Sequence, residues 1–263
     1  MPQHQIVFND GQAYEHAMGT WSQVVGQQFL DWLDPLPGLC WLDIGCGNGA
    51  FTELIAQRGN AAEIVGVDPS EAQLAFARGR PRTQHVTFVH GDAMALPFGG
   101  ARFDVSIMAL VLFFVPDPPR SIFEMKRVTR PGGMVAAYVW DNLNDGSPMA
   151  PVRAEMKARG VSIIGPPRTD IANADALRRL WIDAGLEAVE SRSIKAKRTF
   201  VDFENYWLSV ISNTSVGPVV RAMRSSDVER LKLRLRAAGT VGSDGITYEV
   251  RANAITGHVP NLP

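Results

Sequence analysis

A glycine-rich turn between an apolar strand and a helix is the part of this sequence best suited to chemistry. Residues 41–50 are Trp-Leu-Asp-Ile-Gly-Cys-Gly-Asn-Gly-Ala. Glycine adopts positive φ and lets another molecule approach the backbone closely. The helix expected to start near Phe51 offers free N–H groups and a positive dipole end. Residues 41–50 therefore predict a binding corner for a nucleotide-like ligand at the carboxyl end of a first β-strand.

The same stretch resembles motif I of the class I S-adenosylmethionine (SAM)-dependent methyltransferases. The resemblance rests on Asp43 and on the run Gly45-Cys46-Gly47-Asn48-Gly49. It implies that the glycines pass against the methionine part of SAM and that Asp43 helps to hold its amino group. Gly45, Gly47 and Ala50 also satisfy the dinucleotide fingerprint G-x-G-x-x-G/A. At this point an NAD(P)-dependent oxidoreductase is therefore the alternative.

Two further acidic residues follow the next two predicted strands. Asp68 ends the apolar run 64–68 and precedes Pro69, and Asp92 lies between Gly91 and Ala93 after the run 86–90. The resemblance implies that Asp68 bonds the ribose hydroxyls of SAM, a role that would suit either ligand. It also implies that Asp92 bonds the adenine amine and that the next backbone N–H contacts the ring. Nicotinamide dehydrogenases have no regular acidic residue at that offset, so Asp92 favours SAM.

The spacing of apolar residues predicts the elements that must position these groups. The expected fold class is α/β, with a Rossmann-like, mostly parallel sheet of seven strands, one of them antiparallel, and helices on both faces. Helical cap insertions are expected over the cleft. The expected strands are 39–44, 64–68, 86–90, 103–110, 134–140, 188–197 and 246–254, and the expected helices are 51–58, 71–78, 121–129, 151–159, 174–184, 200–212 and 219–238.

This pattern predicts a single methyltransferase domain over residues 1–263. Its core is expected at about 37–141, 172–200 and 245–259, preceded by an amphipathic helix at 12–34. The cap insertions are expected at about 142–170 and 201–240.

Further site residues are expected at the cofactor and around the acceptor. The resemblance implies cofactor contacts from Leu110 and from Tyr14 and Trp21 of a lid-like N-terminal helix, although that helix could simply pack on the sheet. An acceptor cleft is expected to be walled by aromatic residues that could equally belong to the core. These are Phe113, Phe114, Trp140, Tyr206 and Trp207.

Methyl transfer from a sulfonium is an in-line displacement that positioning alone can accelerate. A hydroxyl or carbon acid acceptor would still need a base. The candidates for that base are His16, Asp141 and His258, although a lone histidine is more often a bystander.

Longer patterns narrow the resemblance. Residues 14–22 (YExxMGxWS), GDAxxLPF, PGGxVAAYVWD and the FxxYW at 203–207 resemble bacterial methyltransferases of the type 11 kind. Their core is related to quinone- and sterol-modifying C-methyltransferases. Base-modifying enzymes carry (D/N)PP(Y/F) where this chain has Ala-Leu-Val-Leu. We therefore expect methyl transfer from SAM to a small-molecule acceptor. The alternatives are an NAD(P)-dependent oxidoreductase and a non-catalytic SAM-binding protein.

Composition narrows the remaining classes. The chain has 263 residues, a net charge of −1 and 46% hydrophobic residues, so no basic field attracts nucleic acid. No apolar run is long enough to span a bilayer. The two cysteines, Cys40 and Cys46, are expected to be reduced thiols of a cytoplasmic protein. No cluster has metal-ligand spacing. The expected partner is a small molecule, without nucleic acid or membrane, and the chain is expected to be a monomer or homodimer.

Overall fold

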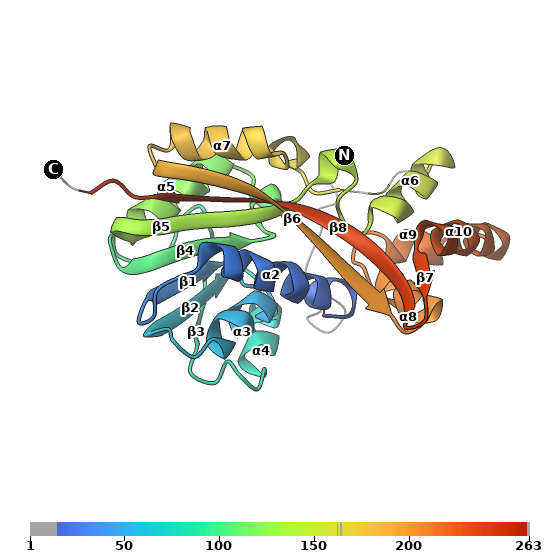
Figure 1. The fold of residues 1–263 in the computed structure, drawn as a ribbon, viewed down its shortest axis with the longest axis horizontal. Helices are drawn as coiled ribbons and strands as arrows, with labels where there is room; N and C mark the ends of the chain where they lie inside the picture. The colour runs from blue at the N-terminus through green and yellow to red at the C-terminus, as the bar shows by residue number, and fades with distance from the viewer. Residues whose placement is uncertain (1–14, 162, 164, 262–263) are drawn as a thin grey trace.

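One twisted β-sheet forms the centre of the molecule (Figure 1). The computed structural model describes residues 15–161, 163 and 165–261. Within them the sheet has eight strands in the order β3-β2-β1-β4-β5-β8-β6, and β7 pairs with the start of β8. The strands are β1 (Cys40–Ile44), β2 (Glu63–Asp68), β3 (Thr87–His90), β4 (Phe103–Ala109), β5 (Thr129–Trp140), β6 (Glu187–Phe200), β7 (Thr240–Gly242) and β8 (Gly245–His258).

Continuous burial explains why the central strands are apolar along their whole length. β1 is buried from Trp41 to Ile44, and β4 is buried from Phe103 to Met108. Parallel strands covered on both faces need such runs. Strands β1 to β5 pair in parallel, and β8 is antiparallel to its neighbours β5 and β6. This arrangement confirms the expected Rossmann-like class with one reversed strand. The additional strand, which the sequence did not predict, is β7. It is short and fully exposed, so its residues show no apolar alternation.

The order of the strands fixes where a ligand can bind. β1 lies between β2 and β4, because the chain runs outward through β2 and β3 and then returns to the other side of β1. At such a switch point the loops after the two central strands diverge, and they leave a crevice at the carboxyl ends of the strands. The glycine-rich turn follows β1, and residues 110–117 follow β4, so both border this crevice.

Helices cover both faces of the sheet. Figure 1 shows α2 and α3 along one side and α5 and α7 along the other. The helices are α2 (Thr20–Leu33), α3 (Ala50–Gln57), α4 (Glu71–Arg78), α5 (Pro118–Val128), α6 (Ala150–Ala158), α7 (Ala174–Asp183), α8 (Phe203–Ile211), α9 (Gly217–Arg221) and α10 (Ser225–Ala238). A π-helical turn, η1 (Glu15–Gly19), precedes α2, and the 3₁₀ turns are η2 (Leu112–Phe114), η3 (Asn142–Asn144) and η4 (Thr169–Ile171).

The C-terminal helices differ from their expected bounds for local reasons. The expected helix 219–238 is two helices, because Arg224 is extended with φ −65° and ψ 143° and α10 begins only at Ser225. α8 begins at Phe203, where the Asp202 carboxylate accepts a hydrogen bond from the Asn205 amide (2.8 Å). Such a side-chain cap satisfies a free N–H group of the first turn and fixes the helix start.

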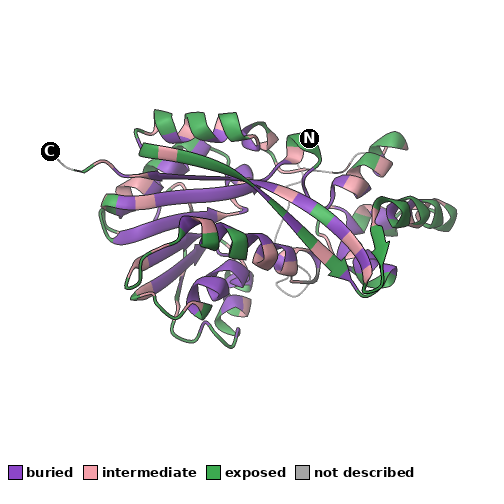
Figure 2. Cartoon of the chain, viewed as in Figure 1, coloured by how far each residue is buried: buried purple, intermediate pink, exposed green. Residues whose placement is uncertain are grey.

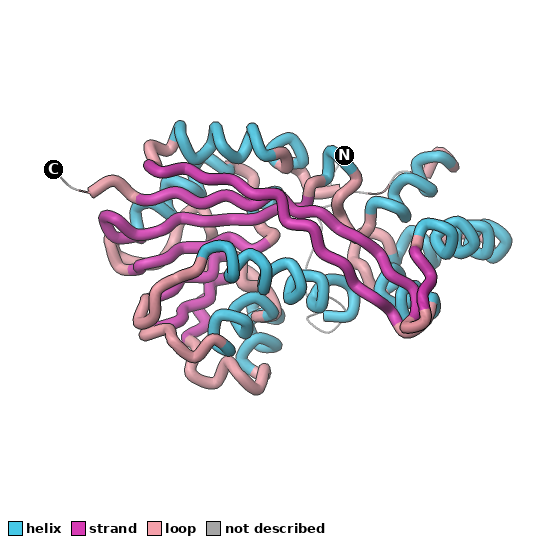
Figure 3. Tube along the Cα trace, in the orientation of Figure 1, coloured by secondary structure: helices cyan, strands magenta, loops and turns pink. Residues whose placement is uncertain are grey.

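Four helices gather beyond one end of the sheet, and we call α6, α8, α9 and α10 the cap. Figure 3 shows β6 and β8 leaving the core as a long ribbon toward the cap. At the end of that ribbon Phe200 pairs with Ile246. The outer surfaces of α7 and α10 are exposed, whereas the central strands are buried (Figure 2). The cap thus lies beyond the sheet, at the end of this ribbon (Figure 1).

Phe29 of α2 joins the N-terminal helix to the core. It is completely buried, and its ring lies 4.8 Å from the Tyr138 ring and 6.1 Å from the Phe51 ring, measured between centroids. We predict that Phe29→Ala lowers the free energy of unfolding by about 3–5 kcal/mol, because it leaves a cavity between α2, α3 and β5. Urea denaturation measures this loss.

Phe123→Ala is the matched control, since the Phe123 side chain on α5 is 56% exposed. Its loss should stay below about 1 kcal/mol. Equal losses for the two variants would contradict the assignment of Phe29 to the core.

Candidate active site

Two physical demands make the turn after β1 a glycine turn. Gly45, Gly47 and Gly49 have φ values of +71°, +52° and +79°, a region that strains other residues. A Cβ atom on Gly45 would also lie 2.5 Å from Val111 Cγ1, and one on Gly49 would lie 2.9 Å from Ala77 Cβ. The turn is tied to β2, because the Gly45 amide donates to the Val67 carbonyl (2.7 Å). The loop therefore presents its backbone at the edge of the crevice.

Asp43 places a buried carboxylate beneath this loop. Its Oδ2 accepts a hydrogen bond from Thr52 Oγ1 (2.5 Å), whereas its Oδ1 is buried and has no partner among the described residues. Burial raises the pKa of Asp43 to about 7, the Thr52 hydrogen bond opposes this rise, and the Asp68 charge adds to it. A buried oxygen without a donor is costly. Asp43 is therefore suited to accept a hydrogen bond from a ligand.

Asp43 lines a hollow that we call the glycine pocket. Its volume is about 340 Å³ including the space open to solvent. Its lining comes from β1, the glycine turn, α2, α3 and the end of β4, namely Ser22, Asp43, Gly45, Cys46, Gly47, Asn48, Ala50, Phe51, Ala109 and Val111. Burial, with the nearby Asp43 charge, raises the pKa of the Cys46 thiol well above its ordinary value. The thiol therefore stays protonated and acts as an apolar wall.

Asp68 and Asp92 lie at the ends of adjacent strands, as the sequence predicts. Asp68 accepts hydrogen bonds from the amides of Gly47 (2.9 Å) and Ser70 (2.8 Å). Burial raises its pKa, and these two hydrogen bonds oppose the rise. Asp92 is exposed two residues after β3, and its carboxylate accepts from the Met94 amide (2.8 Å). Pro69 is exposed and Ala93 half-buried beside them. The three predicted acidic positions thus border one edge of the sheet.

A second hollow, which we call the acceptor cleft, lies between the core and the cap. Its volume is about 590 Å³ including its open mouth. Leu110, Phe113, Phe114 and Trp140 line it, as expected for three of the five predicted aromatic residues. The other lining residues are Met18, Asn142, Ser147, Pro148, Met149, Arg153, Pro166, Asn213, Thr214 and Ser215.

Three consecutive residues separate the two hollows. Ala109 and Val111 line the glycine pocket, whereas Leu110 between them lines the acceptor cleft. Leu110 has φ +63°, a conformation that costs a residue with a side chain about 1–2 kcal/mol, and its amide donates to the Tyr138 carbonyl (2.9 Å). Strain of this kind concentrates at functional sites. The end of β4 is thus the place where ligands in the two hollows would meet.

Most residues of the glycine pocket lie in a stretch of sequence that matches a known protein family. Residues 42–137 match a family model described as a methyltransferase domain. The matched stretch contains the glycine turn, Asp68, Asp92 and the strained end of β4, and it ends inside β5 before the cap.

Known proteins resemble this chain in sequence or in fold. Demethylmenaquinone methyltransferase of Staphylococcus aureus is 35% identical over 131 residues, 49% of this chain and 52% of that protein. The chain thus spans about half the length of the curated relatives it matches. The YcgJ protein of Bacillus subtilis has the same fold, with TM-score 0.61, 15% identity and coverage of 93% of this chain and 100% of that one. A phosphoethanolamine N-methyltransferase of Haemonchus contortus, solved with S-adenosylhomocysteine, gives TM-score 0.57 and 18% identity over 95% of this chain and 57% of its own.

Several predicted site residues lie apart from both hollows. Tyr206 of α8 stacks on Tyr248 of β8 with ring centroids 3.8 Å apart, and Trp207 stacks on Phe203 of the same helix α8. Trp21 is buried between α2 and β6, with its ring 6.2 Å from that of Phe200. All three are absent from the lining of the two hollows. These three side chains pack in the interior, which was the alternative to a role in ligand binding.

The candidate bases are not gathered at the acceptor cleft. Asp141 is buried and ion-paired with Arg251 (2.7 Å), and Asn144 also donates to its carboxylate. His258 pairs with Met134 in the middle of β5, whereas the cleft residue Trp140 is the last residue of that strand. Tyr14 and the side chain of His16 lie outside the described part of the chain. A catalytic role for Asp141 or His16 stays a prediction.

The described part of the chain contains neither a cluster of metal-ligating side chains nor a helix that could span a membrane. Among residues 15–161, 163 and 165–261, no group of three or more His, Cys, Asp or Glu side chains is placed to hold a metal ion. No helix there is long and apolar enough to cross a bilayer.

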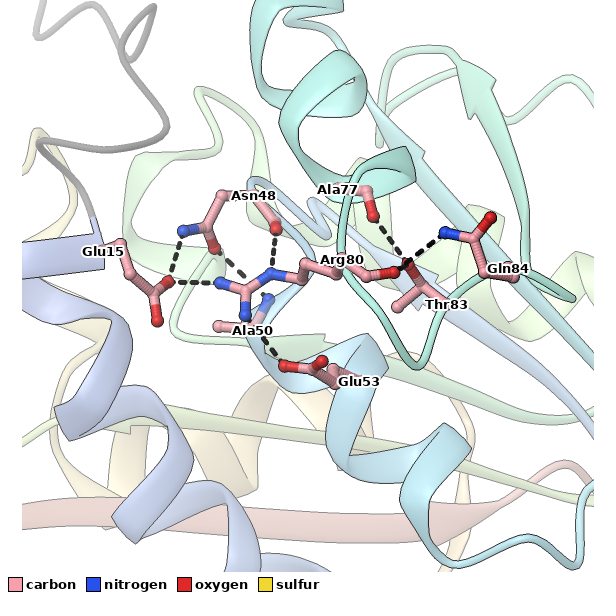
Figure 4. Close-up of polar contacts among 8 residues, drawn as sticks. All are labelled: Glu15, Asn48, Ala50, Glu53, Ala77, Arg80, Thr83 and Gln84. Carbon is pink, nitrogen blue, oxygen red and sulfur yellow. Dashed lines mark hydrogen bonds and ion pairs between the residues drawn. The ribbon is translucent and has the colours of Figure 1, made fainter.

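Arg80 is the residue of this site that sequence reasoning missed. Its Nε donates to the Asn48 carbonyl (2.6 Å), and its guanidinium forms ion pairs with Glu53 (2.8 Å) and with Glu15 (Figure 4). Asn48 Nδ2 also donates to Glu15 (2.7 Å). Arg80 thus joins η1, the glycine turn and α3. No spacing in the sequence links these four positions, so only the folded chain reveals them.

The Arg80 network gives a stability prediction. The side chains of Arg80 and Glu53 are only 9% and 10% exposed, so Arg80→Met leaves a buried carboxylate without its cation. We expect the free energy of unfolding to fall by about 3–5 kcal/mol, measured by urea denaturation. Adding Glu53→Gln to Arg80→Met should restore part of the loss, because the uncompensated charge is removed.

Arg78→Met is the control for this experiment. Arg78 pairs with Glu71 on the surface, where the two side chains are 45% and 62% exposed. A pair of this kind contributes about 1 kcal/mol or less. If Arg78→Met and Arg80→Met cost the same, the Arg80 network is not a buried support of the glycine turn.

Proposed function

We propose that the chain transfers a methyl group from SAM to a small-molecule acceptor. The observation that carries this proposal is the junction at Ala109–Val111. There a pocket with an unpaired buried carboxylate meets a cleft walled by aromatic side chains. One hollow would hold the methyl donor and the other the acceptor. The methyltransferase family of residues 42–137 supports the same assignment.

The residues of the glycine pocket fit SAM. Asp43 Oδ1 is a buried acceptor without a donor, which suits the amino group of the methionine part. The glycine turn lets the ligand pass close to the backbone. The resemblance assigns the ribose hydroxyls to Asp68 and the adenine amine to Asp92, and the structure brings these side chains to neighbouring strand ends. The SAM-related ligand of the Haemonchus contortus neighbour agrees with this cofactor.

The protein's contribution to the reaction is to position the two molecules. When bound, SAM supplies a methyl group on a sulfonium, which is already activated for displacement. Among the described lining residues of the cleft there is no histidine, cysteine or carboxylate. Leu110, Phe113 and Trp140 instead hold an apolar body and keep water from the transfer line. Holding two reactants in line can supply several powers of ten in rate.

The names of curated relatives suggest the type of acceptor. Demethylmenaquinone methyltransferase, by its name, acts on a quinone. An aromatic cleft between core and cap agrees with an acceptor that contains a ring. We therefore propose a small, ring-bearing acceptor for this chain. The cap lies outside residues 42–137, so the family match does not include the cap residues that line the acceptor cleft.

Calorimetric titration with S-adenosylhomocysteine tests the cofactor. We expect wild type to bind it, and Asp68→Asn to bind it about 10- to 100-fold more weakly, because a charge-assisted hydrogen bond to the ligand is lost. Asp183→Asn on the exposed face of α7 is the control and should bind as wild type does. Binding of NADH in place of S-adenosylhomocysteine would instead indicate an oxidoreductase.

A second experiment separates an enzyme from a protein that only binds SAM. The purified chain is incubated with SAM and a set of small aromatic phenols, quinols and amines, and release of S-adenosylhomocysteine is measured. An enzyme of the proposed class releases it with at least one acceptor. Tight SAM binding without release across the whole set would favour the non-catalytic alternative.

The pKa of Asp43 gives a pH prediction. With a pKa of about 7, the carboxyl group is largely protonated at pH 6 and ionised above pH 7. The amino group of the ligand has an ordinary pKa of about 7.7–8.0, so it stays cationic up to about pH 7.5. Affinity for S-adenosylhomocysteine should therefore rise several-fold between about pH 6 and pH 7.5.

Asp43→Asn cannot ionise, so this variant should bind more weakly and lose most of the rise with pH. Titration calorimetry at the two pH values measures both effects. The same rise in Asp43→Asn as in wild type would assign the pH dependence to another group.

A further inference from the structure

A single charged side chain lines the acceptor cleft in the described part of the chain. It belongs to Arg153 of α6, in the cap. The remaining lining consists of apolar, hydroxyl and amide side chains. The guanidinium passes close to the backbone at residue 165, since a Cβ on Gly165 would lie 3.0 Å from Arg153 Nη1. Arg153 is thus half-buried between its helix and a neighbouring loop, on the cap side of the cleft.

The Arg153 guanidinium has no counter-charge among the described residues. Among the described residues no carboxylate lies within 4.0 Å of it, and no side chain accepts a hydrogen bond from it. Two other arginines of low exposure are paired, because Arg80 meets Glu53 and Glu15, and Arg127 meets Glu124. Arg198 also forms no ion pair among the described residues, but its guanidinium lies over the rings of Trp21 and Phe200. Burial lowers the pKa of Arg153, with no neighbouring charge opposing this effect. A desolvated cation without a partner is costly, so its placement needs a reason.

A second donor in the same cleft also lacks an acceptor. Asn142 of η3 lines the cleft, and its Nδ2 is buried without a hydrogen-bond partner among the described residues. Asn142 and Arg153 come from different elements, η3 and α6, yet face one hollow. Two donors without acceptors call for a ligand rich in acceptor oxygens. A cation and an amide donor that line the same cleft can together bind an anionic oxygen group.

We propose that the methyl acceptor carries one carboxylate, bound by Arg153 and Asn142 at the cap side of the cleft. This inference rests on the proposed function and specifies its acceptor. One guanidinium neutralises one negative charge, whereas a phosphate dianion would leave a second charge uncompensated in a partly buried site. The planar guanidinium also matches a carboxylate with two parallel hydrogen bonds. With the carboxylate at the cap, the apolar body lies along Phe113 and Trp140, and the atom to be methylated points toward Leu110.

Matched probes test the charge of the acceptor. Protein saturated with S-adenosylhomocysteine is titrated calorimetrically with 2-naphthoate and with 2-naphthamide, which share a ring system but differ in charge. S-adenosylhomocysteine lacks the sulfonium charge, so a preference for the anion cannot arise from the cofactor. We expect wild type to bind naphthoate about tenfold or more tightly than naphthamide.

Variants assign that preference to Arg153. Arg153→Gln should bind the two probes equally and retain affinity for S-adenosylhomocysteine, whereas Arg153→Lys should keep part of the preference. Lys157→Gln is the matched control, because it removes one positive charge from the exposed side of the same helix, one turn later. It should leave the preference unchanged.

The outcomes separate this inference from the proposed function. If S-adenosylhomocysteine does not bind to wild type, the proposed function fails. If it binds but naphthoate shows no advantage, or if Arg153→Gln and Lys157→Gln behave alike, the carboxylate proposal is overturned. A 2-naphthyl phosphate probe that binds tenfold more tightly than naphthoate would overturn the choice of a singly charged group.

Discussion

The buried guanidinium of Arg80 is the interaction on which the rest of the cofactor side depends. It holds one carboxylate from α3, one from η1 and a backbone carbonyl of the glycine turn at the same time. A glycine turn with three residues at positive φ has little conformational preference of its own. The hydrogen bond from Arg80 to the Asn48 carbonyl therefore helps to hold the turn in one conformation. The same contacts hold η1, the segment before α2, next to the glycine turn.

Both sides of the site contain polar groups whose needs the protein does not meet. Asp43 Oδ1 and Asn142 Nδ2 are buried without partners among the described residues, and Leu110 is held in a strained conformation. Each of these costs stability in the free protein. The large buried core beneath the sheet offsets such costs, because Leu42, Ile44 and Ile107 are fully buried there. Ligand binding would therefore add hydrogen bonds that these buried polar groups do not form in the free protein.

The sequence predicted those parts of the site that depend on local pattern. Asp43, Asp68 and Asp92 each follow or lie within an apolar run, and parallel pairing brings the ends of such runs to one edge. Tyr206 and Trp207 were expected in the cleft. The direction of an aromatic side chain depends on how its helix is oriented, and α8 places Tyr206 against Tyr248 and Trp207 against Phe203. Arg80 and Arg153 act through contacts between distant elements, which no spacing in the chain records.

The ribbon formed by β6 and β8 has a consequence for how this protein can diversify. Phe200 and Ile246 are paired partners, so the chain leaves the sheet and re-enters it at the same place. Everything between them, including α8 to α10, is in topological terms a single hairpin loop. Lengthening such a loop changes its closure entropy only slowly, so its content can be exchanged with little effect on the sheet. The part of the cap formed by α8, α9 and α10 is therefore a replaceable segment, and its exchange would leave the sheet and the glycine pocket intact.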